Sequence, residues 1–122
     1  MPTNIGPVDP SATLDIDFAA QDTHAYAYRL WWRDAGADWV EIGMGGTATG
    51  MPNHVQHAVV AGAQLYYVMN VGTAQGQPKP DAYSATLTFR QKGALLAGST
   101  VSIVGTTDTL GVATNQDWAN FT

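Results

Sequence analysis

The amino-acid sequence predicts an all-β protein, a single antiparallel β-sandwich of seven to nine strands with no long helix. Thirteen glycines and six prolines interrupt the chain at short intervals. Between them, apolar and polar residues alternate with the period of two that a half-buried strand requires. No stretch of roughly 12 or more residues carries apolar residues at the helical spacing i, i+3, i+4 and i+7. A closed β-barrel is the alternative, because one sequence does not reveal strand tilt and shear.

The first half of the chain contains five predicted strands. Leu14, Ile16 and Phe18 alternate with two aspartates, which indicates a half-buried strand with a carboxylate-bearing outer face. The next two strands flank the turn DAGAD, and two more lie on either side of Gly62. The predicted ranges are 14–18, 25–33, 38–44, 53–61 and 63–71.

The second half begins with the longest predicted loop, residues 72–81, where two prolines exclude regular strand pairing. The run AYSATLTFR that follows alternates cleanly, and QKGA is typical of a turn. Strand signals at intervals of about 8 to 12 residues are the pattern expected of a sandwich. The remaining predicted strands span residues 82–90, 99–107 and 111–121.

Length and composition indicate one domain over residues 1–122, with residues 1–11 as an irregular lead-in that carries three prolines. A chain of 122 residues is long enough for one hydrophobic core and too short for two ordinary ones. Charged residues make up 12%, about half of their usual share. The surface is therefore expected to be neutral and rich in hydrogen-bonding groups.

The charge balance and the absence of cysteine exclude several classes of function. The formal charge is −5 with only five basic residues, so we expect no nucleic-acid partner and no attraction to an anionic membrane. With no cysteine, the chain has no disulfide, no thiolate metal ligand and no cysteine nucleophile.

The first 18 residues have neither the basic segment nor the apolar segment of a signal peptide. No run approaches the roughly 18 apolar residues of a membrane helix, so we expect no membrane insertion. A cytoplasmic location is the default expectation, and secretion stays open if a leader was removed from this chain.

The stretch YAYRLWWR, residues 26–33, divides into two alternating sets on opposite faces of a strand. One set contains Arg29 and Arg33, and burying either without a partner would cost several kcal/mol. That set therefore faces outward and takes Trp31 with it. The inward set is Tyr26, Tyr28, Leu30 and Trp32.

The same reasoning applies to the neighbouring strand at 38–44, where Glu41 must face outward together with Trp39. Inward residues must oppose inward ones, so Leu30 is predicted to pair with Val40. The inward set of this strand is Val40, Ile42 and Met44.

This register sets Trp31 opposite Trp39 and Arg29 opposite Glu41 on the outer face. It leaves a three-residue loop at 34–36, whose last residue is a glycine that supplies the positive φ of a common hairpin turn. Stacking and cation–π contacts of about 0.5–1.5 kcal/mol each would hold the outer aromatic pair.

Three interpretations of the outward indoles remain open. They are covered by another part of the chain, such as residues 72–81 or the lead-in, or by a second copy of the chain in a homo-oligomer. Alternatively they form a platform on which a sugar face or a proline-rich peptide stacks. The candidate binding residues are Trp31, Trp39, Arg29, Arg33, Glu41, Asn53, Asn70 and Gln75.

The leading functional hypothesis is a non-enzymatic binding module, lectin-like or protein-binding, that takes a carbohydrate or protein ligand and forms a homo-oligomer. The alternative is a structural or assembly subunit, such as a shell, fibre or secretion-system component, with the aromatic residues buried between copies. An enzyme is the third reading, because no catalytic motif is present and GMGGTATG lacks the lysine and following helix of a phosphate loop.

Metal binding has two weak candidates. His54 and His57 are three residues apart, which on a strand places them on opposite faces and prevents both from reaching one ion. Asp15 and Asp17 share a face about 7 Å apart, so they are possible Ca²⁺ ligands or acid–base groups. The more common role for such a pair is to keep an edge strand soluble. No cofactor is otherwise expected.

Residues 16–71 resemble the middle of a fibronectin type III or immunoglobulin-like sandwich. The resemblance lies in the aromatic Trp32 before a hairpin and the tyrosine-rich strand with Tyr66 and Tyr67 after it. It implies an immunoglobulin- or fibronectin-like topology, and a jelly-roll-like order is the other sandwich considered.

Overall fold

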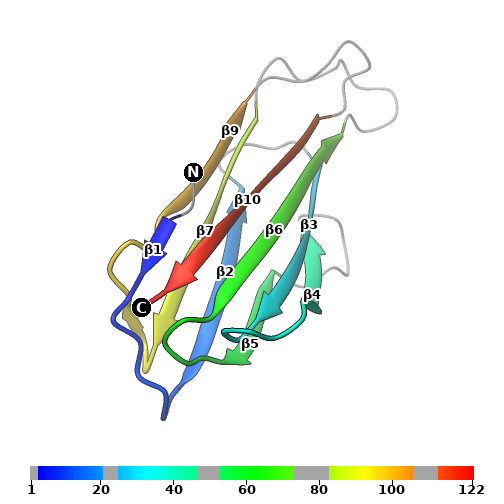
Figure 1. Ribbon diagram of the computed structural model, residues 1–122. Helices are drawn as coiled ribbons and strands as arrows, with labels where there is room; N and C mark the ends of the chain where they lie inside the picture. Colours follow the sequence, from blue (N-terminus) through cyan, green and yellow to red (C-terminus); the bar gives the residue numbers. More distant parts are fainter. Residues whose placement is uncertain (1–2, 21–24, 47–52, 73–82, 106–112) are drawn as a thin grey trace.

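The computed structural model describes residues 3–20, 25–46, 53–72, 83–105 and 113–122, and it is all-β within these ranges. Its strands form two sheets that pack face to face, which confirms the predicted sandwich (Figure 1). The ten strands are β1 (Thr3–Ile5), β2 (Thr13–Ala20), β3 (Ala25–Arg33), β4 (Val40–Gly46), β5 (His54–Ala58), β6 (Gln64–Gly72), β7 (Tyr83–Gln91), β8 (Ala94–Leu95), β9 (Val101–Gly105) and β10 (Ala113–Phe121).

The first sheet has the order β1-β10-β6-β3-β4, and the second has the order β5-β2-β7-β8, with β9 also paired to β7. The count exceeds the predicted seven to nine because the short strands β1 and β8 were not expected. One pair, β1 with β10, is parallel rather than antiparallel.

The strand order differs from that of an immunoglobulin-like sandwich. There, the two strands equivalent to β6 and β10 follow one another along the chain. Here β7, β8 and β9 of the second sheet lie between them in the sequence. The resemblance of residues 16–71 therefore does not extend to the topology.

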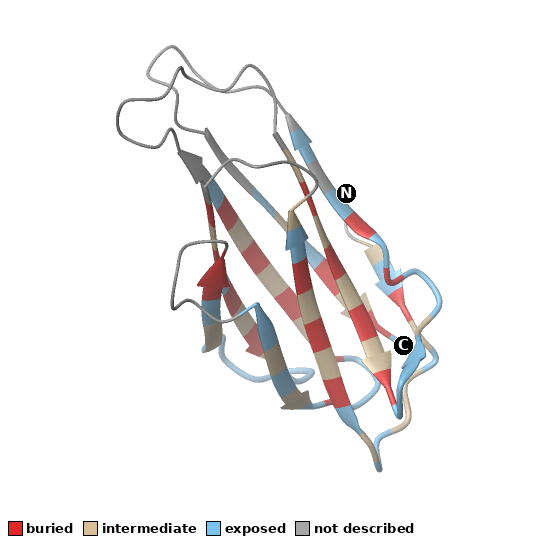
Figure 2. Cartoon of the chain, turned by 180° about the vertical axis from the view of Figure 1, so that it is seen from behind, coloured by how far each residue is buried: buried red, intermediate tan, exposed pale blue. Residues whose placement is uncertain are grey.

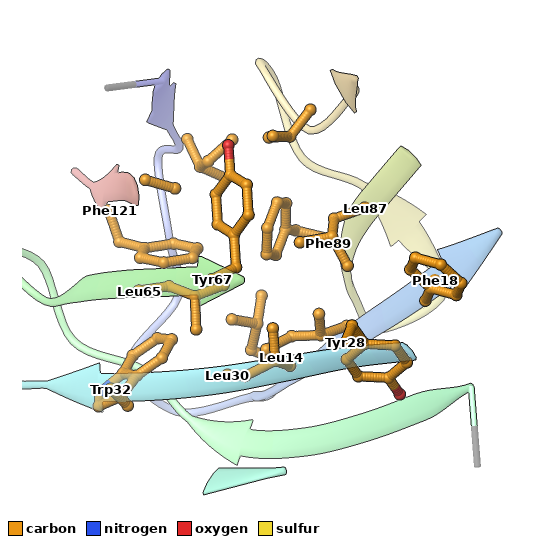
Figure 3. Packing of buried hydrophobic residues seen from close by; sticks show 14 of the residues in the cluster. Leu14, Phe18, Tyr28, Leu30, Trp32, Leu65, Tyr67, Leu87, Phe89 and Phe121 are labelled. Atoms are coloured by element: carbon orange, nitrogen blue, oxygen red, sulfur yellow. The ribbon is translucent and has the colours of Figure 1, made fainter. Parts of the chain in front are cut away.

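The core is formed by the inward set of each strand, and buried residues alternate with exposed or half-buried ones along the arrows (Figure 2). The four inward residues of β3 are at most 3% exposed, as predicted from the two arginines. Trp32 packs on Phe121 with ring centroids 4.9 Å apart (Figure 3). Burial raises the pKa of the Tyr67 phenol far above its usual value, with the nearby Asp117 carboxylate as a smaller cause.

The predicted face assignment of β4 is wrong at Met44, which is 52% exposed and is paired with the outward Arg29. Ile42 packs partly against the core. Val40 is paired with the inward Trp32 and yet is 61% exposed, at the start of this edge strand. The connection from β3 uses residues 34–39 instead of three residues, and a bulge interrupts the pairing between Leu30 and Trp31. An extra residue in one strand changes the face of every residue beyond it, which turns Met44 outward.

Gly43 takes the inward position opposite Leu30 that the bulge creates. A Cβ atom at this glycine would lie 2.6 Å from Cγ2 of Val55, so a larger residue would require the Val55 side chain of β5 to shift. The two sheets therefore meet along this side of the sandwich.

Both predicted turns contain the expected glycine. Gly36 has φ of 78°, and the amide of Ala37 donates to the carbonyl of Asp34 at 2.9 Å. Between β7 and β8, Lys92 and Gly93 have φ of 54° and 78°, the combination of a two-residue type I′ hairpin.

The lead-in is fixed to β7 by a buried glutamine. Gln91, 5% exposed, donates from Nε2 to the carbonyls of Asp9 (2.8 Å) and Ala12 (3.0 Å). Its Oε1 accepts from the amide of Asp9 at 2.8 Å. The described part of the segment that was predicted to be irregular therefore has a defined path, from β1 of the first sheet to β7 of the second.

Within the described ranges, the structure contains no helix long and apolar enough to cross a membrane.

Replacing Gln91 by alanine should lower the free energy of unfolding by about 1–3 kcal/mol, because three partly buried backbone groups lose their side-chain partner. Urea denaturation measures this change. The matched control is Gln56→Ala, whose exposed Nε2 donates to Asp15 at 2.8 Å and whose loss should cost less than about 0.5 kcal/mol. Equal effects of the two substitutions would contradict the role assigned to Gln91.

Stability should also depend on pH through Asp9. Hydrogen bonds from Lys92 and Ser11 hold the pKa of this carboxyl well below its usual range. A depressed pKa stabilises the fold above the unfolded value of about 4, and this contribution fades as the pH falls below it. At pH 6, Lys92→Met should therefore unfold at a lower temperature than the wild type. The difference between the two unfolding temperatures should become smaller below about pH 4. A gap of constant size would contradict this assignment.

Candidate functional site

Three aromatic residues lie side by side on the outer face of the first sheet. Trp31 of β3 is in register with Tyr66 of β6, and Tyr66 is in register with Trp118 of β10. Directly paired residues point to the same face of a sheet. Trp31, Tyr66 and Trp118 therefore form a row that runs across the strands, which we call the aromatic row.

A surface pocket of about 330 Å³ lies at one end of this row, lined by Trp31, Trp39 and Tyr66. The ring of Tyr66 lies 5.6 Å from that of Trp31, at an interplanar angle of 46°, and 6.1 Å from that of Trp39, at 62°. Trp39 is the last residue of the connection before β4 and is 41% exposed. All three side chains that line the pocket are thus aromatic.

Two arginines fix the indoles. The guanidinium carbon of Arg29 lies 5.0 Å from the ring centroid of Trp31, and that of Arg33 lies 4.6 Å from the ring centroid of Trp39. Such contacts contribute about 0.5–1 kcal/mol each at exposed sites. Nη2 of Arg29 also pairs with Oε2 of Glu41 at 2.6 Å.

The predicted outer register is corrected by the structure. Trp31 lies opposite Glu41, not opposite Trp39, and Arg29 lies opposite Met44. Arg29 and Glu41 still meet because both side chains share the outer face and are diagonal neighbours. The two indoles contact Tyr66, which takes the central place that was assigned to a direct tryptophan pair.

A row of polar side chains runs beside the aromatic row, one outward position further along each strand. Arg33 donates from Nε to Oε1 of Gln64 at 2.7 Å, and Gln64 donates from Nε2 to Oδ1 of Asn120 at 2.6 Å. Asn120 donates from Nδ2 to Oδ1 of Asn4 at 3.4 Å. We call these four residues, Arg33, Gln64, Asn120 and Asn4, the amide row.

Three of the predicted binding residues, Asn53, Asn70 and Gln75, are not among the described residues that form this site. Asn53 is exposed just before β5 of the second sheet, where its carbonyl accepts from the amide of Phe18 at 2.9 Å. Asn70 is exposed on β6 but lies four residues from Tyr66, about 13 Å along the strand. Gln75 lies outside the described residues. Only the hairpin residues of the prediction come together.

The sequence reasoning missed Tyr66, Trp118, Gln64 and Asn120 as site residues. Alternation in the predicted strand 63–71 does put Tyr66 and Gln64 on one face, so half of the information needed to find the site was present in the sequence. The other half is the order of strands, because β6 pairs with β3, and β10 pairs with β6, only through long-range contacts.

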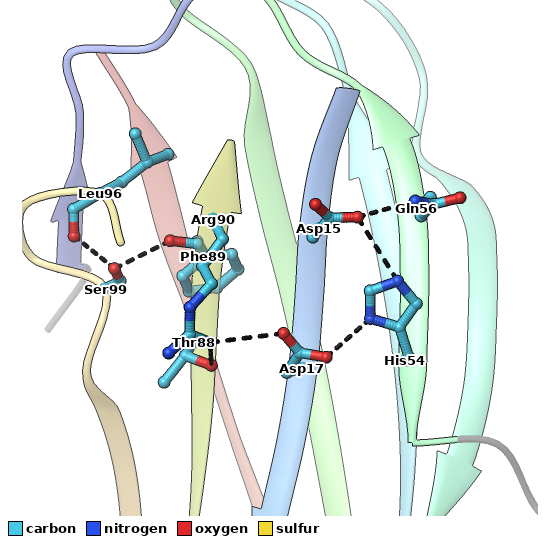
Figure 4. Close-up of polar contacts among 9 residues, drawn as sticks. All are labelled: Asp15, Asp17, His54, Gln56, Thr88, Phe89, Arg90, Leu96 and Ser99. Atoms are coloured by element: carbon cyan, nitrogen blue, oxygen red, sulfur yellow. Dashed lines mark hydrogen bonds and ion pairs between the residues drawn. The ribbon is translucent and has the colours of Figure 1, made fainter. Parts of the chain in front are cut away.

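A second polar cluster covers the outer face of the second sheet (Figure 4). His54 lies between the two predicted calcium candidates, with Nδ1 2.6 Å from Oδ1 of Asp17 and Nε2 3.4 Å from Oδ1 of Asp15. Arg90 approaches the other oxygen of Asp17 at 3.5 Å. Because basic and amide groups occupy these carboxylates, the cluster resembles a surface ion-pair network more than a cation site.

The two histidines of β5 face opposite ways, as strand geometry predicts. The ring of His57 packs on Trp32 at 4.7 Å, on the side of the core, whereas His54 lies among the outer carboxylates. No group of three or more His, Cys, Asp or Glu side chains is arranged to hold a metal ion in the part of the chain that the structure describes.

Comparison of the chain with protein-family models, with curated proteins and with solved structures found no match. Any functional argument therefore depends on the geometry of the site itself.

Removing the central ring should loosen the pocket. Tyr66→Ala is expected to lower the free energy of unfolding by about 1–3 kcal/mol and to increase acrylamide quenching of tryptophan fluorescence, because both indoles lose their ring neighbour. Tyr66→Phe is the control: it keeps the ring and loses only the hydrogen bond to Gln116, so quenching should stay at the wild-type level. Unchanged quenching in Tyr66→Ala would show that this ring does not order the indoles.

Proposed function

We propose that this protein is a non-enzymatic carbohydrate-binding module that holds a sugar ring in the pocket formed by Trp31, Trp39 and Tyr66. The observation that carries the proposal is this aromatic pocket beside a row of hydrogen-bonding side chains. Its volume of about 330 Å³ lies within the range of ligand pockets, roughly 300–1,000 Å³.

The two kinds of surface match the two kinds of surface on a sugar. The C–H faces of a pyranose ring are apolar and pack on aromatic rings, while its hydroxyl groups need both donors and acceptors. Amide side chains such as Gln64 and Asn120 provide both, and Arg33 provides donors. None of these groups transfers protons readily at neutral pH, which favours binding over catalysis.

An assembly subunit is the second candidate, and one observation favours it. Val40 and Met44 are exposed along β4, an edge strand of the first sheet, next to the exposed Trp39. Exposed apolar edge strands pair with other chains unless they are blocked. In that case the same aromatic residues would be buried between copies.

Binding can be tested on an array of neutral monosaccharides and oligosaccharides, followed by calorimetric titration with any sugar that binds. Trp31→Ala and Trp39→Ala should each weaken binding about tenfold or more, the effect of losing an aromatic stacking partner of about 1.5 kcal/mol. Leu95→Ala is the matched control, because Leu95 is 52% exposed on the second sheet. It should bind like the wild type.

Light scattering on the same proteins separates the two candidates. A wild-type protein that binds no sugar, and whose dimer or larger assembly dissociates in Trp39→Ala, would overturn the carbohydrate proposal and support assembly. Unfolding of both tryptophan variants, seen as a lost thermal transition, would show that the indoles act in the fold and not in binding.

A further inference from the structure

Building on the proposed function, we infer that the ligand is a soluble, uncharged, linear oligosaccharide that lies across the strands. One sugar ring occupies the pocket, and the next ring along stacks on Trp118. The pocket alone does not require this second position. It follows from the aromatic row, the amide row and the charges around them.

The length of the aromatic row exceeds one sugar ring. Trp31, Tyr66 and Trp118 are on three consecutive strands, and neighbouring strands are about 4.8 Å apart. The backbone positions of Trp31 and Trp118 are therefore separated by about 10 Å. A monosaccharide in the pocket does not reach Trp118, whereas a disaccharide or longer chain does.

Trp118 is available to a ligand. Its side chain is 40% exposed, and no ring among the described residues stacks against it, in contrast to Trp31 and Trp39. Tyr66 lies between the pocket and Trp118, and its hydroxyl donates to Oε1 of Gln116 at 2.6 Å. The hydrogen bond limits the freedom of the central ring, which reduces the entropy lost when a ligand binds.

The amide row extends the polar side of the site over the same length. It spans four strands, from Asn4 on β1 to Arg33 on β3, at about 7 Å from the aromatic row. Its internal hydrogen bonds leave donors unused, since a guanidinium carries five N–H groups and an amide carries two. A chain that lies on the aromatic row can therefore form hydrogen bonds along its whole length.

The charges of the site favour an uncharged ligand. Arg29 is neutralised by Glu41 at 2.6 Å, so Arg33 is the remaining cation beside the pocket within the described part of the first sheet. The net charge of −5 opposes the approach of a polyanion such as an acidic polysaccharide.

The tilt of the rings favours a single chain over a crystalline surface. The planes of Trp31 and Trp39 are inclined to Tyr66 by 46° and 62°. A flat polysaccharide crystal needs coplanar rings beneath it, whereas the rings of a free chain can rotate about each glycosidic bond. The tilted rings thus fit a soluble oligomer.

The test is calorimetric titration with a ladder of β-1,4-linked glucose oligomers from one to six units, repeated with the corresponding xylose ladder. For the wild type, affinity should rise about fivefold or more between one and three units and then level off. Trp118→Ala should remove this rise and leave monosaccharide binding within about twofold of the wild type. Trp118→Phe keeps a ring and should retain most of the rise.

The outcomes separate this inference from the proposed function. Two results would overturn the second sugar position and leave the proposed binding pocket supported. One is equal affinity of the wild type for monosaccharides and oligosaccharides, and the other is an increase of affinity with chain length that remains in Trp118→Ala. A wild type that binds no member of either ladder or of the wider array would overturn both. Tighter binding of oligogalacturonate than of the neutral ladders would overturn the assignment of an uncharged ligand.

Discussion

The pairing of β3 with β6 in one register is the constraint on which both faces of the first sheet depend. Each strand carries two adjacent aromatic residues, Trp31 and Trp32 on β3 and Tyr66 and Tyr67 on β6, and Trp31 is paired directly with Tyr66. Because neighbours on a strand point to opposite faces, this register supplies Trp32 and Tyr67 to the core and the other two rings to the pocket. A slip by one residue would exchange them and destroy the core and the pocket together.

The parts of this arrangement that the sequence predicts follow from local rules. Arg29 and Arg33 determine the outward face of β3, so the four core residues of that strand are assigned correctly. The positive φ of Gly36 is also predicted from the residue type alone, since few residues other than glycine adopt that conformation. Alternation also predicts the core face of β2 and β7.

The parts that the sequence does not predict depend on residues far apart in the chain or on irregular backbone. The β3–β4 register assumed the shortest hairpin loop, but the connection takes residues 34–39 and a bulge follows it. Nothing in the pattern of residues 38–44 marks the bulge. The place of Trp118 opposite Tyr66 is set by β10, which reaches β6 only after the second sheet is complete.

The two rows of side chains act on one another through Arg33. Its guanidinium stacks on Trp39, at 4.6 Å from the ring, and donates to Gln64 in the same geometry. Trp39 lies in the connection before β4 and not in a strand, so its ring is held by the contact with Arg33. Trp31, in contrast, is positioned by strand pairing. Trp118, which is 40% exposed, has no comparable cation or ring partner among the described residues. Arg33 therefore joins the pocket to the amide row, whereas the proposed second sugar position depends on the indole of Trp118 alone for its stacking surface.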